Sequence, residues 1–237
     1  MIRAWLSLPL WLLALWIIAM TACTSMGSHN VLARTDIDFG PAERLSFCLL
    51  VDEGITERAA RQLIDDAWRE EGALYGLTID VVSVARWPRP AYTMHGILDA
   101  LLRHPLHPQC DRVFALVGRH VGDVVWGLIG LPEVLGAVDD NTSTHGYAVV
   151  QRASLNQVFM PPTSVVRHEI YHLLGCAEHF NMSGCYETIT TMKRRKRDGG
   201  SDFFPAWDVI NDRPLVSRDA VNARLLEVIR AGRTSQD

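Results

Sequence analysis

Apolar residues occur along this chain in short runs separated by polar turns, after one long apolar run at the amino terminus. Runs at 45–51, 77–85 and 112–117 have the length and composition of β-strands. Between these runs, apolar residues recur at helical spacing over 56–75 and 95–103. Strands that alternate with helices in this way predict a βαβ-like beginning to a mostly parallel sheet.

The second half of the chain shows fewer regular elements. Residues 121–138 are rich in glycine and apolar side chains, which predicts a loop over the edge of the sheet. Residues 145–151 follow as a strand that we expect to form the exposed edge. An amphipathic stretch at 216–229 predicts a closing helix. The residues suited to its ends are Ser217 or Asp219 at the start and Gly232 after the last turn.

A further helix is predicted between the two prolines at 161–162 and Gly175. Thr163 and Ser164 are suited to its N-cap, and Gly175 can take the positive φ that ends it. Four apolar residues spaced as i, i+4, i+7 and i+8 form one stripe along this helix: Val166, Ile170, Leu173 and Leu174.

The side of this helix opposite the apolar stripe carries two histidines. His168 and His172 stand four residues apart, so on a helix they point the same way and can bind one metal ion. Glu169 lies about 100° around the helix, where its carboxylate can hydrogen-bond a water molecule at the ion instead of coordinating it. Catalytic zinc uses three protein ligands and one open position. The spacing therefore predicts a zinc hydrolase site that needs one more ligand.

The whole stretch, HEIYHLLGCAEH, resembles the metzincin metallopeptidases, whose motif is HExxHxxGxxH. Residues 168–175 match this motif, but the family position of the third ligand falls on Glu178, and the histidine follows at His179. This pair is similar to the aspartate and histidine of the snapalysin-like members. The preference of zinc for imidazole favours His179 as the third ligand, with Glu178 as the alternative.

The resemblance implies an α+β, zincin-like fold with a twisted, mostly parallel sheet, an antiparallel edge strand, an active-site helix and a C-terminal helix. In such proteins the edge strand borders the cleft, where an extended peptide can add to the sheet. The resemblance also implies that Met192, rather than the nearer Met182, occupies the methionine turn beneath the metal. By the same resemblance, Tyr186 is a candidate for stabilising an oxyanion, with burial in the core as the alternative.

The long apolar run at the amino terminus covers Ala4 to Ala22 and ends in small residues before Cys23. This pattern predicts a secretory signal at 1–22, and it resembles a bacterial lipoprotein signal in which Cys23 is lipidated after cleavage. An uncleaved membrane anchor is the alternative, because about 20 apolar residues span a bilayer. The residue after Cys23 is Thr24 and not aspartate, which resembles the sorting pattern of outer-membrane lipoproteins in Gram-negative bacteria. We therefore expect an outer-membrane lipoprotein of the cell envelope that faces the periplasm or the exterior.

After the signal, residues 23–41 are predicted to form a polar tether, and 42–237 a single zinc metallopeptidase domain. The formal net charge of −4 is not that of a nucleic-acid-binding protein, which is typically basic, so we expect no nucleic-acid partner. The basic run KRRKR at 193–197 is expected to be a solvated loop, with an electrostatic contact to an anionic membrane or an acidic substrate as the alternative. The scattered histidines are expected to be structural or surface residues. For His145 a place beside the cleft is the alternative, because its strand is the expected edge. The others in this group are His95, His104, His107 and His120.

Apart from Cys23, four cysteines remain, and an even number fits disulfides in an oxidising compartment. Three pairings are possible. Cys176 with Cys185 is favoured because it would close the loop that carries both third-ligand candidates, which leaves Cys48 with Cys110. Free buried thiols are the alternative, and the absence of a CxxC spacing disfavours a cysteine-based zinc site.

Together these patterns predict an exported, membrane-anchored zinc endopeptidase that hydrolyses peptide bonds, with peptides or proteins as substrates. The metal ligands are His168, His172 and His179, and the general base is Glu169. Two alternatives stay open. One is an inactive binding or assembly lipoprotein of the zincin fold, and the other is a zinc amidase that acts on cell-wall peptides.

Overall fold

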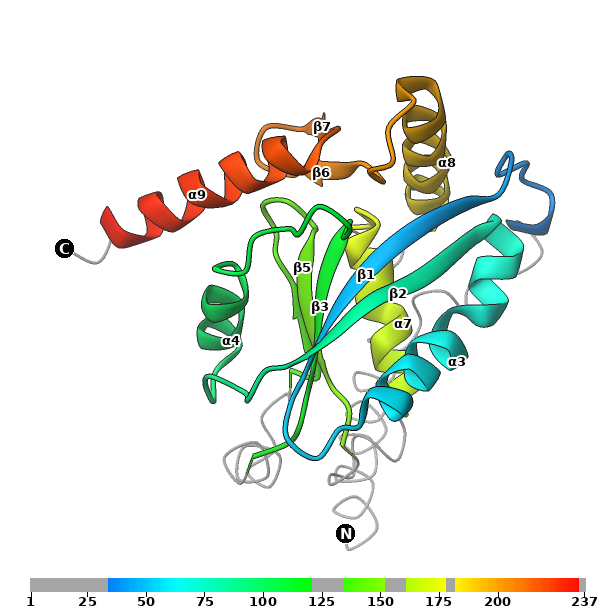
Figure 1. The fold of residues 1–237 in the computed structure, drawn as a ribbon. Helices are drawn as coiled ribbons and strands as arrows, with labels where there is room; N and C mark the ends of the chain where they lie inside the picture. Colours follow the sequence, from blue (N-terminus) through cyan, green and yellow to red (C-terminus); the bar gives the residue numbers. More distant parts are fainter. Residues whose placement is uncertain (1–33, 121–133, 152–160, 178–181, 235–237) are drawn as a thin grey trace, which may run out of the picture.

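The structure is a computed structural model that describes residues 34–120, 134–151, 161–177 and 182–234. Its centre is a twisted five-stranded sheet with the strand order β2-β1-β3-β5-β4, in which β4 alone runs antiparallel to its neighbour (Figure 1). The strands are β1 Glu43–Val51, β2 Leu77–Arg86, β3 Arg112–Val117, β4 Gly136–Val138 and β5 His145–Val149. The predicted α+β architecture, with a mostly parallel sheet and an antiparallel edge strand, is confirmed.

Helices cover both faces of this sheet (Figure 1). The helices α3 and α7 pack on one face, and α4 and α9 pack on the other. A fifth helix, α8, and a small hairpin of β6 and β7 complete the described fold. The bounds are α3 Glu57–Tyr75, α4 Met94–Leu101, α7 Pro162–Leu173, α8 Met182–Gly199, β6 Ala206–Asp208, β7 Arg213–Leu215 and α9 Arg218–Thr234.

The strand β3 is buried on both of its faces, which explains its unbroken apolar sequence. Phe114 and Leu116 face the core under α3 and α7, whereas Val113 and Val117 face the core under α4 and α9. Burying one such side chain stabilises the fold by about 1.5–3 kcal/mol. The core on the α3 and α7 face therefore holds the motif helix α7 against the sheet.

The exposed edge of the sheet differs from the prediction. The strand β5 lies between β3 and β4, and all five of its residues are buried. The edge strand is β4, which comes from the stretch predicted as a loop. Gly146 permits this pairing, because a Cβ atom on it would lie 2.7 Å from the Val138 side chain.

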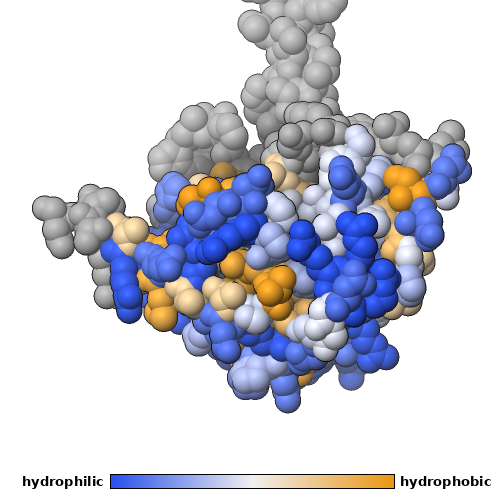
Figure 2. Space-filling model, turned by 90° about the horizontal axis from the view of Figure 1, so that it is seen from above, coloured by the Kyte–Doolittle hydropathy of each residue, from blue (hydrophilic) through white to orange (hydrophobic). Residues whose placement is uncertain are grey.

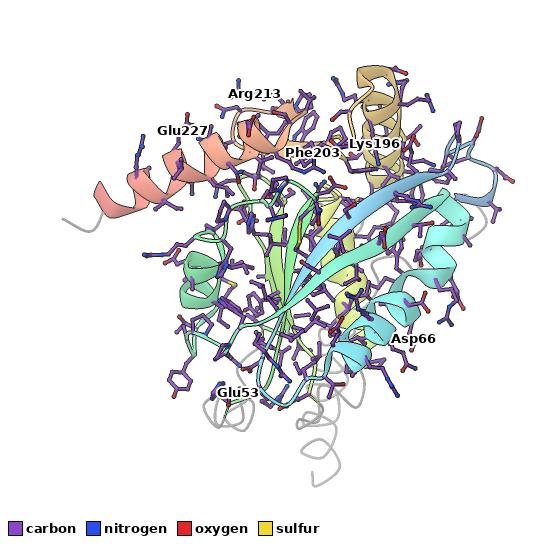
Figure 3. All side chains as sticks on the ribbon, viewed as in Figure 1. Glu53, Asp66, Lys196, Phe203, Arg213 and Glu227 are labelled. Atoms are coloured by element: carbon purple, nitrogen blue, oxygen red, sulfur yellow. A yellow bond between two sulfur atoms is a disulfide. The ribbon has the colours of Figure 1, made fainter. Side chains whose placement is uncertain are left out.

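The basic run at 193–197 was expected to be a loop, but it belongs to the helix α8. Lys193 is only 1% exposed, and its ammonium group donates to the Tyr75 carbonyl. Lys196 lies 5.8 Å from the Phe204 ring, beside the connection that carries Phe203 (Figure 3). Two cations of this run are thus part of the packing between α8 and its neighbours.

Two other residues of α8 lie outside the roles that the resemblance gave them. Met192 is buried within the helix and not in a turn, so its assignment to a methionine turn is wrong. Tyr186 is also buried, with its ring 6.2 Å from Tyr75 and 6.1 Å from Phe39. Apolar residues three or four apart along α8 explain both placements, since they turn one helix face inward.

Several helix ends follow from local chemistry. The Thr56 hydroxyl caps α3 by accepting from the Ala59 amide at 3.2 Å. The predicted N-cap of α7 at Thr163 or Ser164 is wrong, because the helix already begins at Pro162, and proline is favoured in the first turn. The helix α9 continues through Gly232 to Thr234, so that glycine does not end it.

Both favoured disulfides are present. Cys48 and Cys110 are joined, with 5.7 Å between their Cα atoms. Cys176 and Cys185 are joined, with 4.8 Å between their Cα atoms, and this bond links the segment after α7 to the first turn of α8.

The predicted signal and the lipidation site at Cys23 lie outside the described residues. Within the described part of the chain, every helix is too short or too polar to span a bilayer. The last residues of the predicted tether lie against the domain, since Phe39 is buried in its core.

The β6–β7 hairpin and the helices α8 and α9 form the upper side of the molecule in Figure 1. Figure 2 looks onto this side and shows a mainly hydrophilic surface with separate hydrophobic patches. Exposed apolar side chains on the hairpin, the segment after β7 and α9 are Ile210, Val216 and Leu226.

Candidate active site

The two motif histidines lie one helical turn apart on α7 and converge. Their Nε2 atoms are 3.1 Å apart, and their rings meet at a steep angle with centroids 4.8 Å apart. Both side chains are half-buried. Two imidazole nitrogens this close require a proton or a cation between them, since two lone pairs repel each other.

The orientation of His172 is fixed by the end of its own helix. Gly175 has a φ of +88°, which turns the chain so that the Cys176 carbonyl faces back toward the ring. The Nδ1 atom of His172 lies 2.7 Å from that carbonyl oxygen, and a carbonyl can only accept, so we assign the proton to Nδ1. This tautomer leaves the Nε2 lone pair directed at the site, as in metal-binding histidines.

Glu169 lies beside the histidines and is only 4% exposed. Among the described residues, its Oε2 atom is buried and has no hydrogen-bond partner. Burial raises the pKa of its carboxyl group to about 8. A carboxyl in this environment can take up and release a proton near neutral pH, which is what a general base needs.

The edge strand β4 approaches this carboxyl closely. A Cβ atom on Gly136 would lie 2.5 Å from the Glu169 Oε1 atom, which is closer than real Cβ contacts. Glycine at this position therefore lets the edge strand and the carboxyl group occupy adjacent space.

Buried polar contacts hold α7 on its far side. The Tyr171 hydroxyl donates to the Glu71 carboxylate of α3 at 2.6 Å, and the Arg34 guanidinium pairs with the same carboxylate at 2.6 Å. The Tyr75 hydroxyl lies 2.7 Å from that of Tyr171. These contacts set the position of the residue that directly precedes His172.

The C-terminal end of α7 is held by Arg112, which is fully buried in β3. Its guanidinium donates to the carbonyls of Leu173 and Pro205 at 2.7 Å each, and to that of Phe204 at 3.1 Å. One side chain thereby satisfies the last carbonyl of α7 and those of the segment before β6.

A hollow of about 350 Å³ opens above the three motif residues. One wall is the α7 helix, and the others come from β4 with the turn after it, from α4, and from the hairpin residue Val209. His168, Glu169 and His172 all line this space. The structure thus brings together the three predicted residues that it describes.

The geometry of the histidine pair fits zinc. Two nitrogens bound to one tetrahedral zinc ion at 2.0–2.1 Å lie about 3.3 Å apart, close to the 3.1 Å between the two Nε2 atoms. Within the described residues, no group of three or more potential metal ligands is present. Glu178 and His179, the two candidates for the third ligand, lie outside those residues.

Sequence reasoning missed several residues of the hollow. His95, expected to be structural or a surface residue, lines it from α4, and Asp140 lines it from the turn after β4. The structural role expected for His145 is confirmed, because this residue is fully buried in β5 with its Nε2 atom 2.7 Å from the His104 carbonyl oxygen. Burial lowers the pKa of His145 to about 4. No local pattern marks His95 or Asp140, because only the tertiary fold brings them to α7.

Comparisons with known proteins give a limited result. No protein-family model matches the chain, and no curated protein sequence matches it. Among solved structures, the chain is similar to archaemetzincin from Methanopyrus kandleri, with 16% sequence identity and a TM-score of 0.38. That alignment covers 62% of this chain and 86% of the other. At this level of similarity, the chemistry of the site rests on its own geometry.

Proposed function

We propose that this protein is a zinc-dependent endopeptidase that is exported and anchored to a membrane of the cell envelope. The observation that carries the proposal is the convergence of the His168 and His172 Nε2 atoms, 3.1 Å apart, beside the buried carboxyl of Glu169. The Oε2 atom of that carboxyl has no hydrogen-bond partner among the described residues. His168 and His172 would hold zinc, with His179 as the proposed third ligand and Glu178 as its alternative. Zinc held there would polarise the scissile carbonyl and lower the pKa of a water molecule toward about 7.

The remaining chemistry falls to the residues of the chain. Glu169 accepts the proton of the attacking water and then passes it to the amine of the leaving peptide. Its burial beside the two histidines supports this role, since a carboxyl whose pKa is raised by burial both accepts and returns a proton near neutral pH. A binding scaffold without turnover has no need of a carboxyl in this position, so Glu169 supports an enzyme.

The proposed anchor is the lipidated Cys23 of an outer-membrane lipoprotein, supported by the apolar run that precedes it. The presence of both disulfides in the described fold supports export, because disulfides persist in oxidising compartments. Cys23→Ser should abolish lipidation and release the protein from the membrane without a change in specific activity. If the Cys23→Ser protein stays in the membrane and, like the wild type, is extracted only by detergent, the result would instead support an uncleaved anchor.

The function is tested with the full-length protein and its Glu169→Ala variant, purified in detergent. Zinc content is measured by mass spectrometry, and cleavage is followed on a library of unstructured peptides. We expect about one zinc per chain in both proteins and cleavage by the wild type alone. Zinc-loaded wild-type protein that cleaves no peptide, or a fully active Glu169→Ala variant, would contradict the proposal.

A further inference from the structure

One wall of the hollow is the turn between β4 and β5, which the proposed chemistry does not use. Asp139 and Asp140 begin this turn, and both line the hollow. Asp139 is 3% exposed, and its two oxygens accept four hydrogen bonds of 2.6–3.0 Å from Asn141 and Thr142. The hydrogen bonds of the Asp139 carboxylate therefore stabilise the turn.

Asp140 differs from its neighbour, because its side chain is exposed. No ion pair or hydrogen bond joins its carboxylate to any of the residues that the structure describes. It is thus a negatively charged group at the rim of the hollow that is available to a ligand.

Hydrogen bonds keep this turn at a set place relative to α4. The Thr142 and Thr144 hydroxyls are 2.6 Å apart, and the Thr144 hydroxyl lies 2.9 Å from the His145 Nδ1 atom. On its other side, the His145 ring contacts the His104 carbonyl, just after α4. Because this chain of contacts is buried, the spacing between the two walls is fixed before a substrate arrives.

The walls near Asp140 are mainly apolar. Met94 and Leu98 of α4 are half-buried and line the hollow, as do Val138 of the edge strand and Val209 of the hairpin. Among the described residues that line it, none is lysine or arginine. An apolar wall with a carboxylate at its rim matches the chemistry of a long cationic side chain, whose methylene stem is apolar and whose end is charged.

A second observation indicates that the hollow binds a ligand. The Glu169 side chain is buried, lines the same space, and has an Oε2 atom without a partner among the described residues. Buried carboxylate oxygens are ordinarily hydrogen-bonded, so this atom indicates a site that is completed when a ligand is bound.

We infer that the hollow selects substrates with a lysine or arginine side chain, whose stem lies along Met94 and Leu98 and whose charged end pairs with Asp140. This inference rests on the proposed peptidase function and names the substrate class of that site. An acidic side chain at the same place would face the Asp140 carboxylate, and lysine and arginine are absent from the described residues that line the hollow, so such substrates are disfavoured.

The test measures binding separately from turnover. Full-length Glu169→Ala protein, loaded with zinc, is titrated with fluorescent peptides that are neutral and apolar except for one position, which is lysine, glutamine or glutamate. The varied residue is placed at each position of the peptide in turn, and Kd is measured by fluorescence anisotropy. At one position we expect lysine to bind up to about fivefold more tightly than glutamine, the upper end of the range for an exposed ion pair, and glutamate to bind most weakly.

The variant Asp140→Asn should remove this preference, and Asp140→Lys should reverse it in favour of glutamate. The matched control is Asp80→Asn, because Asp80 is an exposed aspartate on β2, at the opposite edge of the sheet from β4. The control should keep the full preference for lysine. The preference should also shrink in 0.5 M salt, since exposed charges are screened.

Two failures are distinguishable. Wild-type cleavage of the peptides, together with equal binding of the lysine, glutamine and glutamate series, would overturn this inference and leave the peptidase function intact. Absence of cleavage by the zinc-loaded wild type would overturn the function itself, whatever the binding shows. A preference for lysine that survives Asp140→Asn would also overturn the inference, because the selecting charge would then lie elsewhere.

Discussion

The Tyr171 hydroxyl lies 2.6 Å from the Glu71 carboxylate and donates a hydrogen bond to it. This contact joins the motif helix α7 to α3 at the residue before His172. Glu71 is 3% exposed, and its charge is balanced by Arg34 at 2.6 Å. A buried charge pair of this kind needs both of its members, because either one alone would be a buried charge without a partner.

Removing Glu71 should therefore destabilise the protein strongly. We expect Glu71→Ala to lower the free energy of unfolding by about 3–5 kcal/mol, because it removes one member of a buried charge pair, the carboxylate that Arg34 contacts at 2.6 Å. The measurement is urea denaturation followed by circular dichroism. Replacing both residues, as Arg34→Met with Glu71→Leu, should cost clearly less than the sum of the two single changes. Strict additivity would contradict a coupled pair.

Gly136→Ala should impair catalysis more than metal binding. The new methyl group would lie 2.5 Å from the Glu169 Oε1 atom, so either the carboxyl or the edge strand must move. A displacement of about 1 Å at a reacting group can cost 100-fold in rate. We expect kcat to fall by about this factor while one zinc per chain is retained, as measured by peptide cleavage and metal analysis.

The matched control for this change is Gly199→Ala at the end of α8. Apart from its chain neighbours and the backbone of its own helix, no atom of the described residues lies within 4 Å of the Cβ that alanine would add there. This variant should keep wild-type activity. Equal loss of activity in both variants would show that the effect is general and not due to the contact with Glu169.

The beginning of the fold was predictable because its signals are local. Periodic apolar residues place β1, α3 and β2 within a few residues of their observed bounds. The edge strand was not predictable in this way, since β4 depends on the close approach of Gly146 to Val138. The helix α8 was missed because its charged end resembled a solvated loop, and the burial of Lys193 depends on contacts with distant carbonyls.

The residues of the candidate site likewise fall into those that local sequence patterns reveal and those that they do not. His168, Glu169 and His172 were found from sequence because helical geometry alone brings residues four apart to one face. His95, Gly136 and Asp140 come from α4, β4 and the following turn, and only the packing of these elements on the sheet brings them to α7. A spacing rule cannot detect residues whose proximity is set by tertiary structure.

Stability should depend on the protonation of His145. Burial lowers the pKa of its ring to about 4, whereas in an unfolded chain the pKa of histidine is about 6.5. Between these two values the unfolded chain binds the proton and the folded protein does not. The contribution of His145 to the free energy of unfolding should therefore fall by up to about 3 kcal/mol as the pH is lowered from about 6.5 to about 4. The buried Glu169 carboxyl, whose pKa is raised, contributes with the opposite sign, so the comparison of His145→Gln with the wild type isolates the contribution of His145.

Urea denaturation at several pH values checks this expectation. The control is His107→Gln, because His107 is exposed and its removal should leave the pH dependence unchanged. His145→Gln should flatten the dependence in this pH range, although the variant starts from a lower stability. A His145→Gln variant whose stability changes with pH between 6.5 and 4 to the same extent as that of the wild type would contradict the prediction.

The two candidates for the third metal ligand, Glu178 and His179, are adjacent in sequence, and alanine variants distinguish them. If His179 is the ligand, the His179→Ala variant should lose its zinc or bind it with severely reduced affinity, because two imidazoles alone hold the ion poorly. Glu178→Ala should then retain the metal with a smaller loss of affinity. Zinc stoichiometry at neutral pH, with competition by a chelator, compares the two variants. Full retention by His179→Ala with loss by Glu178→Ala would reverse the assignment.

The disulfide between Cys176 and Cys185 gives an independent approach to the same loop. It closes the segment that carries both candidates, and the Cys176 carbonyl also accepts the hydrogen bond that orients His172. The double variant Cys176→Ser with Cys185→Ser should therefore lower zinc affinity by about tenfold or more, whichever residue is the ligand. Loss of the Cys48–Cys110 bond is the matched control, because that bond joins β1 to the segment before β3 and not to the loop. Equal zinc affinity in the double variant and the wild type would show that the loop holds its ligand without the crosslink.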